Sequence, residues 1–225
     1  MTTPQRTYGQ RCGLALSLDL LGERWTLLVI RELTRGPKRF KDLMDALDGI
    51  GTNLLSSRLK TLEEAGIAQK VELPPPASTT AYSLTERGRG LQPILEDLAL
   101  WGLGLMPPIN ERPDLTTRAS WAAMTMLATM DRDPRPAPDG IYAFSVGDED
   151  FWLEVKEGRS ELRDGLPQVT PDAHLEIELE DFLMVSIGET TLDEVSNEVG
   201  GDRPRLATLL ETFRIPVEAV QPAGT

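Results

Sequence analysis

Hydrophobic residues in the first half of the chain recur every three or four positions, and glycines interrupt the repeats. This spacing predicts helices over about 12–21, 23–34, 39–47 and 53–65. Thr52 is expected to cap the fourth helix, and Gly66 stands where a left-handed C-cap belongs. Two alternating stretches, 67–73 and 80–84, predict a hairpin, and Thr85 begins a last helix over 86–103. Helix, helix, turn, helix and hairpin in this order are typical of a winged helix-turn-helix.

The second half shifts to the two-residue alternation of strands. An apolar helix is expected over 117–130, and helices over 181–187 and 203–213 close the chain. Three short runs each place their apolar residues on one face: Tyr142, Phe144 and Val146; Phe151, Leu153 and Val155; Leu175, Ile177 and Leu179. The mixture predicts an α+β fold. Because the proline-rich stretch Met106–Pro113 has the composition of a linker, we expect two domains, 1–106 and 107–225.

Charge is divided unevenly between these two parts. The net charge is −13, yet residues 1–106 carry 13 Lys/Arg and 12 Asp/Glu, whereas residues 107–225 carry 10 and 24. An acidic body repels phosphate, so nucleic acid has to meet a local basic face. The densest basic run comprises Lys38, Arg39 and Lys41 at the start of the third helix, with Arg31 and Arg35 just before it. Cations and free amides at a helix start form a phosphate clamp.

The helix over 53–65 has two contrasting stripes. One carries Asn53, Ser56, Ser57, Lys60 and Glu64, and the opposite one carries Leu55, Leu59 and Leu62. A leucine ridge fixes such a helix to a core, and small polar residues let its other side enter the major groove of DNA. Asn53 suits an adenine edge, and Ser56, Ser57 and Lys60 suit bases or phosphates, beside Thr52 at the helix start. Arg58 lies nearer the leucine ridge, where a structural salt bridge or a DNA contact is open.

Residues 12–102 resemble the HxlR-type winged helix-turn-helix regulators, which are relatives of the MarR group. The matching segments are 22–28 (GERWTLL), 36–40 (GPKRF), 55–63 (LSSRLKTLE), 66–67 (GI), 82–85 (YSLT) and Gly88. The resemblance implies a homodimer on a two-fold, palindromic operator, with the helices 12–21 and 86–103 forming the dimer contact. One departure is the wing tip: Pro74–Thr80 has none of the positive charge that the family often inserts into the minor groove.

Cys12 is the only cysteine, so no disulfide forms within the chain. In redox-sensing members of the resembled family a cysteine in this region is oxidised or alkylated, which implies a thiol switch across the dimer. The other interpretation is a small buried hydrophobe, which is common for a free cysteine. Arg11 and the start of a helix both favour a lowered thiol pKa.

The second half resembles the sterol-carrier-protein type of domain over about 115–215. The resemblance lies in Pro171–Ile177, Asp181–Leu183, Gly188 and the Gly201-Asp202 pair before a helix. It implies an apolar tunnel for an acyl chain, a terpenoid or another apolar effector. The candidate pocket residues are Trp121, Met124, Leu127, Phe144, Trp152 and Leu183. Ordinary core packing explains each of them equally, and a module that only supports dimerisation is an open alternative.

Catalysis is not expected. His174 is the single histidine, and one His with one Cys does not make a typical zinc site, so neither a metal nor a cofactor is predicted. There is no G-x-S-x-G elbow and no P-loop. No signal-peptide core and no apolar run near the bilayer length is present, which favours a cytoplasmic protein without a membrane segment. The sequence thus predicts a ligand-responsive DNA-binding regulator. The alternatives are a regulator switched by Cys12, and a lipid-binding protein with a dimerising N-terminal scaffold.

Overall fold

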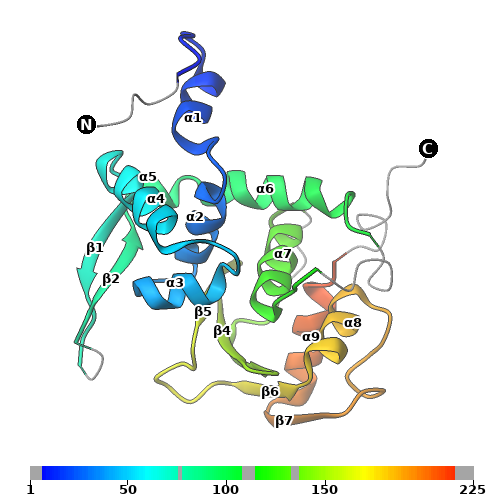
Figure 1. Ribbon diagram of the computed structural model, residues 1–225. Helices are drawn as coiled ribbons and strands as arrows, with labels where there is room; N and C mark the ends of the chain where they lie inside the picture. Colours follow the sequence, from blue (N-terminus) through cyan, green and yellow to red (C-terminus); the bar gives the residue numbers. More distant parts are fainter. Residues whose placement is uncertain (1–6, 76–77, 108–114, 133–136, 216–225) are drawn as a thin grey trace. The chain divides into compact units, whose positions relative to one another are not determined.

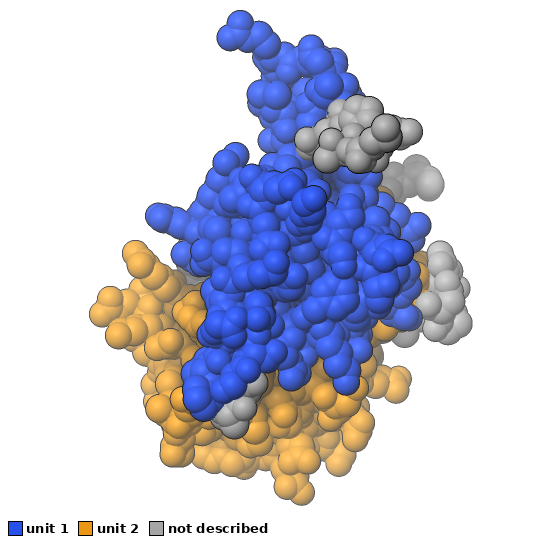
Figure 2. All heavy atoms as spheres, turned by 60° about the vertical axis from the view of Figure 1, so that its left-hand side comes forward, with its two compact units in different colours: residues 1–95 blue, residues 96–225 orange. Residues whose placement is uncertain are grey.

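The computed structural model describes residues 7–75, 78–107, 115–132 and 137–215, and the side chains of 130–132 are not described. The chain divides into two compact units, residues 1–95 and 96–225, which Figure 2 distinguishes by colour. The sequence pattern predicts the division after residue 106. The division falls earlier because Leu100 and Leu103 pack with the apolar core of the second unit.

The first unit is a winged helix-turn-helix. Its elements are α1 (Gly13–Leu21), α2 (Thr26–Thr34), α3 (Phe40–Ala46), α4 (Thr52–Glu64), β1 (Ala68–Glu72), β2 (Thr80–Leu84) and α5 (Glu86–Arg89), followed by α6 (Gln92–Leu103), which continues into the second unit. The two strands form an antiparallel hairpin in which Ala68 pairs with Leu84 and Glu72 with Thr80 (Figure 1). Leucine and isoleucine side chains from α2, α3 and α4 and from the hairpin make one buried cluster. The α+β winged arrangement predicted for this half is confirmed.

Two local predictions in this unit are wrong. Thr52 is the first helical residue of α4 rather than its N-cap, which is Gly51. The single helix expected over 86–103 is two helices. It breaks because Gly90 ends α5 and Pro93 stands in the first turn of α6, where its missing N–H costs nothing. Thr85 does cap α5, since its hydroxyl accepts a hydrogen bond from the Gly88 amide at 3.1 Å.

Glycine is required at the joint between hairpin and α5. A Cβ on Gly88 would lie 2.1 Å from the carbonyl oxygen of Ile67, far inside van der Waals contact. The close approach lets the Thr85 hydroxyl donate to the Gly66 carbonyl at 2.7 Å. Gly66 itself has φ +66°, the left-handed conformation expected of it after α4. The hairpin is thereby held against the end of α4.

The second unit is a five-stranded sheet with helices on one face. Its elements are α7 (Ala119–Arg132), β3 (Gly140–Val146), β4 (Glu149–Lys156), β5 (Arg159–Asp164), β6 (Ala173–Ile177), α8 (Leu179–Ile187), β7 (Asn197–Gly201) and α9 (Arg203–Thr212). The strand order is β5-β4-β3-β6-β7, and only β3 and β6 run parallel among these described strands. Side chains from one face of the sheet and from α7, α8 and α9 form the core.

The predicted alternation holds for most of these strands. Tyr142, Phe144, Val146, Phe151, Leu153, Val155, Leu175 and Ile177 are all buried. Leu179 was expected on the same strand face as Leu175 but begins α8, because Glu178 already has the extended conformation of a helix N-cap. β7 was not expected, since its Asn-Glu-Val-Gly-Gly sequence has the composition of a turn. Within the described residues, no helix is both long and apolar enough to span a bilayer.

Candidate DNA-binding surface and apolar cavity

The helix α4 presents two chemically opposite faces. Leu55, Leu59 and Leu62 are at most 1% exposed and belong to the core of the first unit. The side chains on the other face are exposed: Thr52, Asn53, Ser56, Ser57 and Lys60. Lys60 lies 3.7 Å from the Glu64 carboxylate, a loose surface pair that leaves its ammonium 69% exposed. The helix therefore carries a row of small hydrogen-bonding groups with one cation on its solvent side.

The start of α3 brings two further cations to the surface. Arg39 and Lys41 are exposed, and Lys38 is half-buried, with its backbone paired to Tyr82 of β2. Arg39 is engaged by Asp42: its Nη2 lies 2.7 Å from Oδ1, and its Nε lies 2.9 Å from Oδ2. Its hydrogen bonds to the Asp42 carboxylate raise the pKa of Arg39. A phosphate contact by Arg39 has to compete with this carboxylate, whereas Lys41 is exposed and forms no ion pair among the described side chains.

The other two cations of the expected basic run do not belong to this surface. Arg35 is buried, and its Nη2 lies 2.6 Å from Oε2 of Glu32, which is fully buried. Arg31 pairs with the same carboxylate at 2.8 Å. Their inclusion in a phosphate clamp is wrong, because α2 turns this face towards the core, where the two guanidinium groups neutralise an internal carboxylate. Burial raises the pKa of Glu32, but the charges of Arg35 and Arg31 outweigh it and the net pKa is lowered.

Of the two possibilities for Arg58, a structural salt bridge or a DNA contact, the structure has the salt bridge. Its Nη2 lies 2.9 Å from Oε2 of Glu23, and its Nε donates to the Arg24 carbonyl at 3.1 Å. The side chain is only 14% exposed. Arg58 thus ties α4 to the turn between α1 and α2 rather than facing solvent with Asn53.

The hairpin contributes little positive charge. Lys70 of β1 pairs with Glu63 at 3.3 Å and lies over the ring of Tyr82. Near the tip, Thr80 donates to Glu72 at 2.7 Å, and Pro74 and Pro75 are exposed; Pro76 and Ala77 lie outside the described residues. The described part of the wing is therefore neutral to acidic towards its tip.

Cys12 caps α1 and its side chain is exposed. Hydrogen bonds from the backbone amides of Ala15 and Leu14 lower the pKa of the thiol. The interpretation of Cys12 as a buried hydrophobe is therefore wrong. The thiol is accessible, and its lowered pKa increases the share of thiolate, the form that reacts with oxidants and electrophiles.

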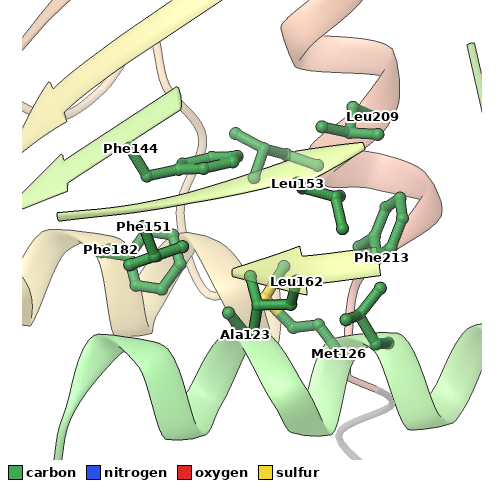
Figure 3. A pocket seen from close by; sticks show the side chains of 11 residues that line it. Ala123, Met126, Phe144, Phe151, Leu153, Leu162, Phe182, Leu209 and Phe213 are labelled. Carbon is green, nitrogen blue, oxygen red and sulfur yellow. The ribbon is translucent and has the colours of Figure 1, made fainter. Parts of the chain in front are cut away.

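The core of the second unit contains a small apolar cavity. Its free volume is about 20 Å³, enough for roughly one water-sized sphere. Residues from six elements, α7, β3, β4, β5, α8 and α9 with its C-cap, line it (Figure 3): Ala123, Met126, Leu127, Phe144, Phe151, Leu153, Leu162, Phe182, Leu209, Leu210 and Phe213. Phe144 and Phe151 stack with ring centres 5.1 Å apart, and Phe182 meets both rings edge-on. No lining side chain has a hydrogen-bonding group, so the cavity offers dispersion contacts alone.

Of the six predicted pocket residues, Leu127 and Phe144 line this cavity. Trp121, Met124, Trp152 and Leu183 do not, and each is half-buried. Trp152 points to the other face of the sheet because it alternates with Phe151 and Leu153. On α7 the cavity is lined by Ala123, Met126 and Leu127 rather than by Trp121 or Met124, and Leu183 follows Phe182 on α8. The missed residues of the cavity, notably Leu209 and Phe213, come from α9 and its end, where nothing in the sequence distinguishes lining from packing.

His174 lies on the outer face of the sheet in a short polar chain. Its Nε2 is 3.0 Å from the Ser145 hydroxyl, which donates to Asp150 at 2.6 Å. The hydroxyl, not the imidazole, is the central group. Because Ser145 gives its proton to the carboxylate, His174 is left to donate to the serine oxygen, which is the reverse of what activates a serine nucleophile.

Comparison with known proteins identifies the first unit. The sequence profile described as HxlR-like helix-turn-helix matches residues 20–110. An uncharacterized HTH-type transcriptional regulator of Synechocystis, sll1512, is 42% identical over 96 residues, which are 43% of this chain and 70% of that protein. The HTH-type transcriptional regulator YodB of Bacillus subtilis is 38% identical over 85 residues, which are 38% of this chain and 76% of YodB.

A solved structure of YodB, described as quinone-bound, is 34% identical and has a TM-score of 0.35, covering 40% of this chain and 93% of that one. The residues that the profile matches include α4, the hairpin and the start of α3, which carry the candidate DNA-binding surface. On the identity with sll1512 and YodB over most of their length, the chain belongs to the HxlR-like helix-turn-helix family.

Proposed function

We propose that the protein is a sequence-specific, DNA-binding transcriptional regulator whose α4 is the recognition helix. The observation that carries the proposal is the exposure of Asn53, Ser56, Ser57 and Lys60 opposite a fully buried leucine ridge. Small side chains let the helix approach base edges closely, and Asn53 has the amide that pairs with adenine. Thr52, Lys38, Arg39 and Lys41 flank this row and supply phosphate contacts.

The test is selection of binding sites from random duplexes, followed by titration of the selected duplex. The double variant Asn53→Ala, Ser56→Ala loses preference for the selected sequence over random duplex, while Ser196→Ala, at an exposed loop position of the second unit, keeps it. Selection that enriches no sequence, or a double variant as selective as the unmodified chain, contradicts the proposal. Salt-insensitive or absent DNA binding would favour the alternative of a lipid-binding protein with a dimerising scaffold.

The regulator acts as a homodimer on a palindromic operator in this proposal. Two helices support it, because both expose apolar side chains: α1 exposes Leu14, Leu16 and Leu18, and α6 exposes Ile94, Leu98 and Trp101 along one side. Isolated apolar rows of this kind are stabilised by a partner surface. Leu14→Glu and Leu98→Glu each convert the dimer to a monomer in sedimentation, whereas Leu166→Glu, at an equally exposed loop position, does not. A chain that sediments as a monomer without any substitution contradicts this part.

The second domain, placed at 107–225 and proposed to be sterol-carrier-like, senses an apolar effector. The support is the cavity with purely apolar walls under the aromatic cluster. At about 20 Å³ it is far below the roughly 300 Å³ of ordinary ligand sites, so binding requires α7 or α9 to move outward. Native mass spectrometry of the full chain detects a co-purified or added apolar molecule. Ala123→Leu fills the cavity and abolishes the adduct; an unmodified chain that carries and takes up none contradicts the proposal.

A thiol-responsive regulator is the second candidate, and the exposed Cys12 with its lowered pKa favours it. With one cysteine per chain, a disulfide joins two protomers: the two thiols lose two protons and two electrons to an oxidant such as a peroxide. A quinone, which the relative YodB is described as binding, would add to the thiolate instead. Cys12→Ser abolishes every effect of peroxide or quinone on DNA affinity. The same effects in the Cys12→Ser chain would exclude Cys12 as the sensor.

A further inference from the structure

The turn Glu23–Trp25 lies against both elements of the helix-turn-helix. On one side, Arg58 of α4 binds the Glu23 carboxylate and the Arg24 carbonyl at 2.9 and 3.1 Å. On the other side, the ring of Trp25 reaches Gly49 in the turn between α3 and α4, where its Cη2 would lie 3.9 Å from a Cβ. The backbone of this turn is therefore fixed beside the recognition helix by two independent contacts.

Trp25 holds a conformation that is costly for a bulky residue. Its φ is +78°, in the left-handed region, where side chains other than glycine are uncommon. The Arg58 clamp and the packing of the ring against the core keep it there. The result is that the residue before it, Arg24, is directed outward and is exposed at the flank of α4.

Arg24 is free to bind an anion, unlike the arginines near it. Arg31 and Arg35 are committed to Glu32, Arg39 to Asp42 and Arg58 to Glu23, whereas Arg24 has no carboxylate within salt-bridge distance among the described residues. Its guanidinium lies over the Trp25 ring, 5.2 Å from the ring centre. This cation–π contact restricts the side chain, and because Arg24 has no carboxylate partner among the described residues, its N–H donors are available for two oxygens of one anion.

We propose that Arg24 binds a DNA backbone phosphate beside the groove that α4 occupies, with Trp25 as its platform and Arg58 as the residue that positions the turn. The inference rests on the proposed function, because the phosphate belongs to the duplex that α4 reads. It adds to the surface a contact from the turn before α2, beside Arg58 of α4. It also offsets the neutral wing, whose usual basic contact is missing at the described positions.

The experiment is anisotropy titration of the full chain on a labelled duplex of random sequence over a series of KCl concentrations. Arg24→Gln lowers the slope of log K against log salt by about 0.9 for each bound protomer, the loss of one phosphate contact, and weakens binding several-fold at low salt. Arg24→Lys keeps the charge and keeps the slope. Arg159→Gln removes the same charge from an exposed position on β5 and leaves the slope unchanged.

The outcomes separate this inference from the proposed function. A salt-dependent unmodified chain together with an Arg24→Gln slope equal to that of Arg159→Gln overturns the role of Arg24 and leaves the regulator proposal intact. An unmodified chain that shows no salt-dependent binding overturns both. Equal melting temperatures of Arg24→Gln and the unmodified chain exclude a loss of folding as the cause of a reduced slope.

Discussion

The two units handle buried polarity in opposite ways. The first unit encloses a charged group, the Glu32 carboxylate, and neutralises it with Arg35 and Arg31. The second unit surrounds its cavity with phenylalanine, leucine and methionine and has no hydrogen-bonding side chain there. A charged core specifies one geometry strictly, because a partner that moves leaves a bare charge. An apolar core tolerates displacement, since dispersion contacts have little direction. The contrast suits the roles proposed for the two units, a rigid reader of DNA and an effector sensor that has to open.

Removal of the internal carboxylate tests this contrast between the two units most directly. Glu32→Ala leaves the buried Arg35 guanidinium without its partner, which costs the first unit about 3–5 kcal/mol of unfolding free energy. Glu64→Ala removes an exposed carboxylate that lies 3.7 Å from Lys60 and costs at most about 1 kcal/mol. Urea unfolding followed by circular dichroism measures both. Equal losses in the two variants would show that burial of the ion pair is not what matters.

The same carboxylate gives the first unit a dependence on pH. The folded-state pKa of Glu32 lies below its ordinary value of 4.5, so folding favours the ionised form. This contribution is fully present above pH 4.5 and is lost as pH falls through the lower, folded-state value. Acid titration of the unfolding free energy therefore shows a decline below that pH, and Glu32→Gln shows a shallower one. A Glu32→Gln chain with the same acid limb would assign the decline to other carboxylates.

The stability of the second unit is expected to depend on the size of its buried side chains rather than on charge. Leu209→Ala removes a fully buried side chain from the cavity wall, which costs the second unit about 2–5 kcal/mol and enlarges the cavity. The enlarged cavity stays dry and binds a small aromatic such as benzene, detected as a rise in melting temperature with added benzene. Leu166→Ala, at an exposed loop position, changes neither quantity. A Leu209→Ala chain indifferent to benzene would mean that the walls collapse to fill the space.

A substitution on the exposed face of α4 is expected to change DNA binding without changing stability. Asn53→Ala lowers discrimination at one base pair of a selected site by about 1–3 kcal/mol. Its effect on the unfolding free energy stays within about 0.5 kcal/mol, because the side chain is exposed on α4. Competition between the selected duplex and single-base variants of it measures the discrimination. Uniform weakening at every base position would mark Asn53 as a phosphate contact instead.

The smallest effect concerns the cap that joins the hairpin to α5. Thr85→Ala loses the bond from the Gly88 amide and the one to the Gly66 carbonyl, and costs about 1 kcal/mol. Thr170→Ala, in an exposed loop, is neutral. Thermal unfolding resolves the difference. A neutral Thr85→Ala would mean that the close packing at Gly88 holds the joint without the hydroxyl.

Hydrophobic periodicity predicted the exposed polar surface of α4 well, because that surface depends on the residue spacing within one helix. Asn53, Ser56 and Leu55 differ in exposure for a reason that lies within the thirteen residues of α4. Arg31 and Arg35 were misplaced because their partner, Glu32, lies on the same helix, and chain order does not reveal which side of α2 is covered. Arg24 was missed for a similar reason: its position depends on the left-handed Trp25 and on Arg58, which is distant in sequence.

The second unit was less predictable because its cavity is a property of the assembled sheet. Alternation correctly identified Phe144 and the buried faces of β3 and β4. It also puts Trp152 on the face opposite the cavity, so the prediction of Trp152 as a pocket residue went against the pattern. β7 lacks β-branched residues apart from Val199 and is a strand because β6 offers it a partner from Ala173 to Ile177. Such long-range pairing is outside what local spacing records.

The parallel pairing of β3 with β6 has a consequence for synthesis. β3, β4 and β5 are joined by tight turns and pair as a meander of consecutive strands, so all three are synthesised before β6 and β7. The other edge of β3, with Tyr142, Phe144 and Val146, waits for β6, and β6 in turn waits for β7. During that interval the nascent chain displays an open strand edge beside uncovered aromatic rings, the kind of surface that recruits a second chain. Slow translation of the last third of the message would lengthen that exposure. A chaperone that binds the nascent chain would protect the open edge from a second chain.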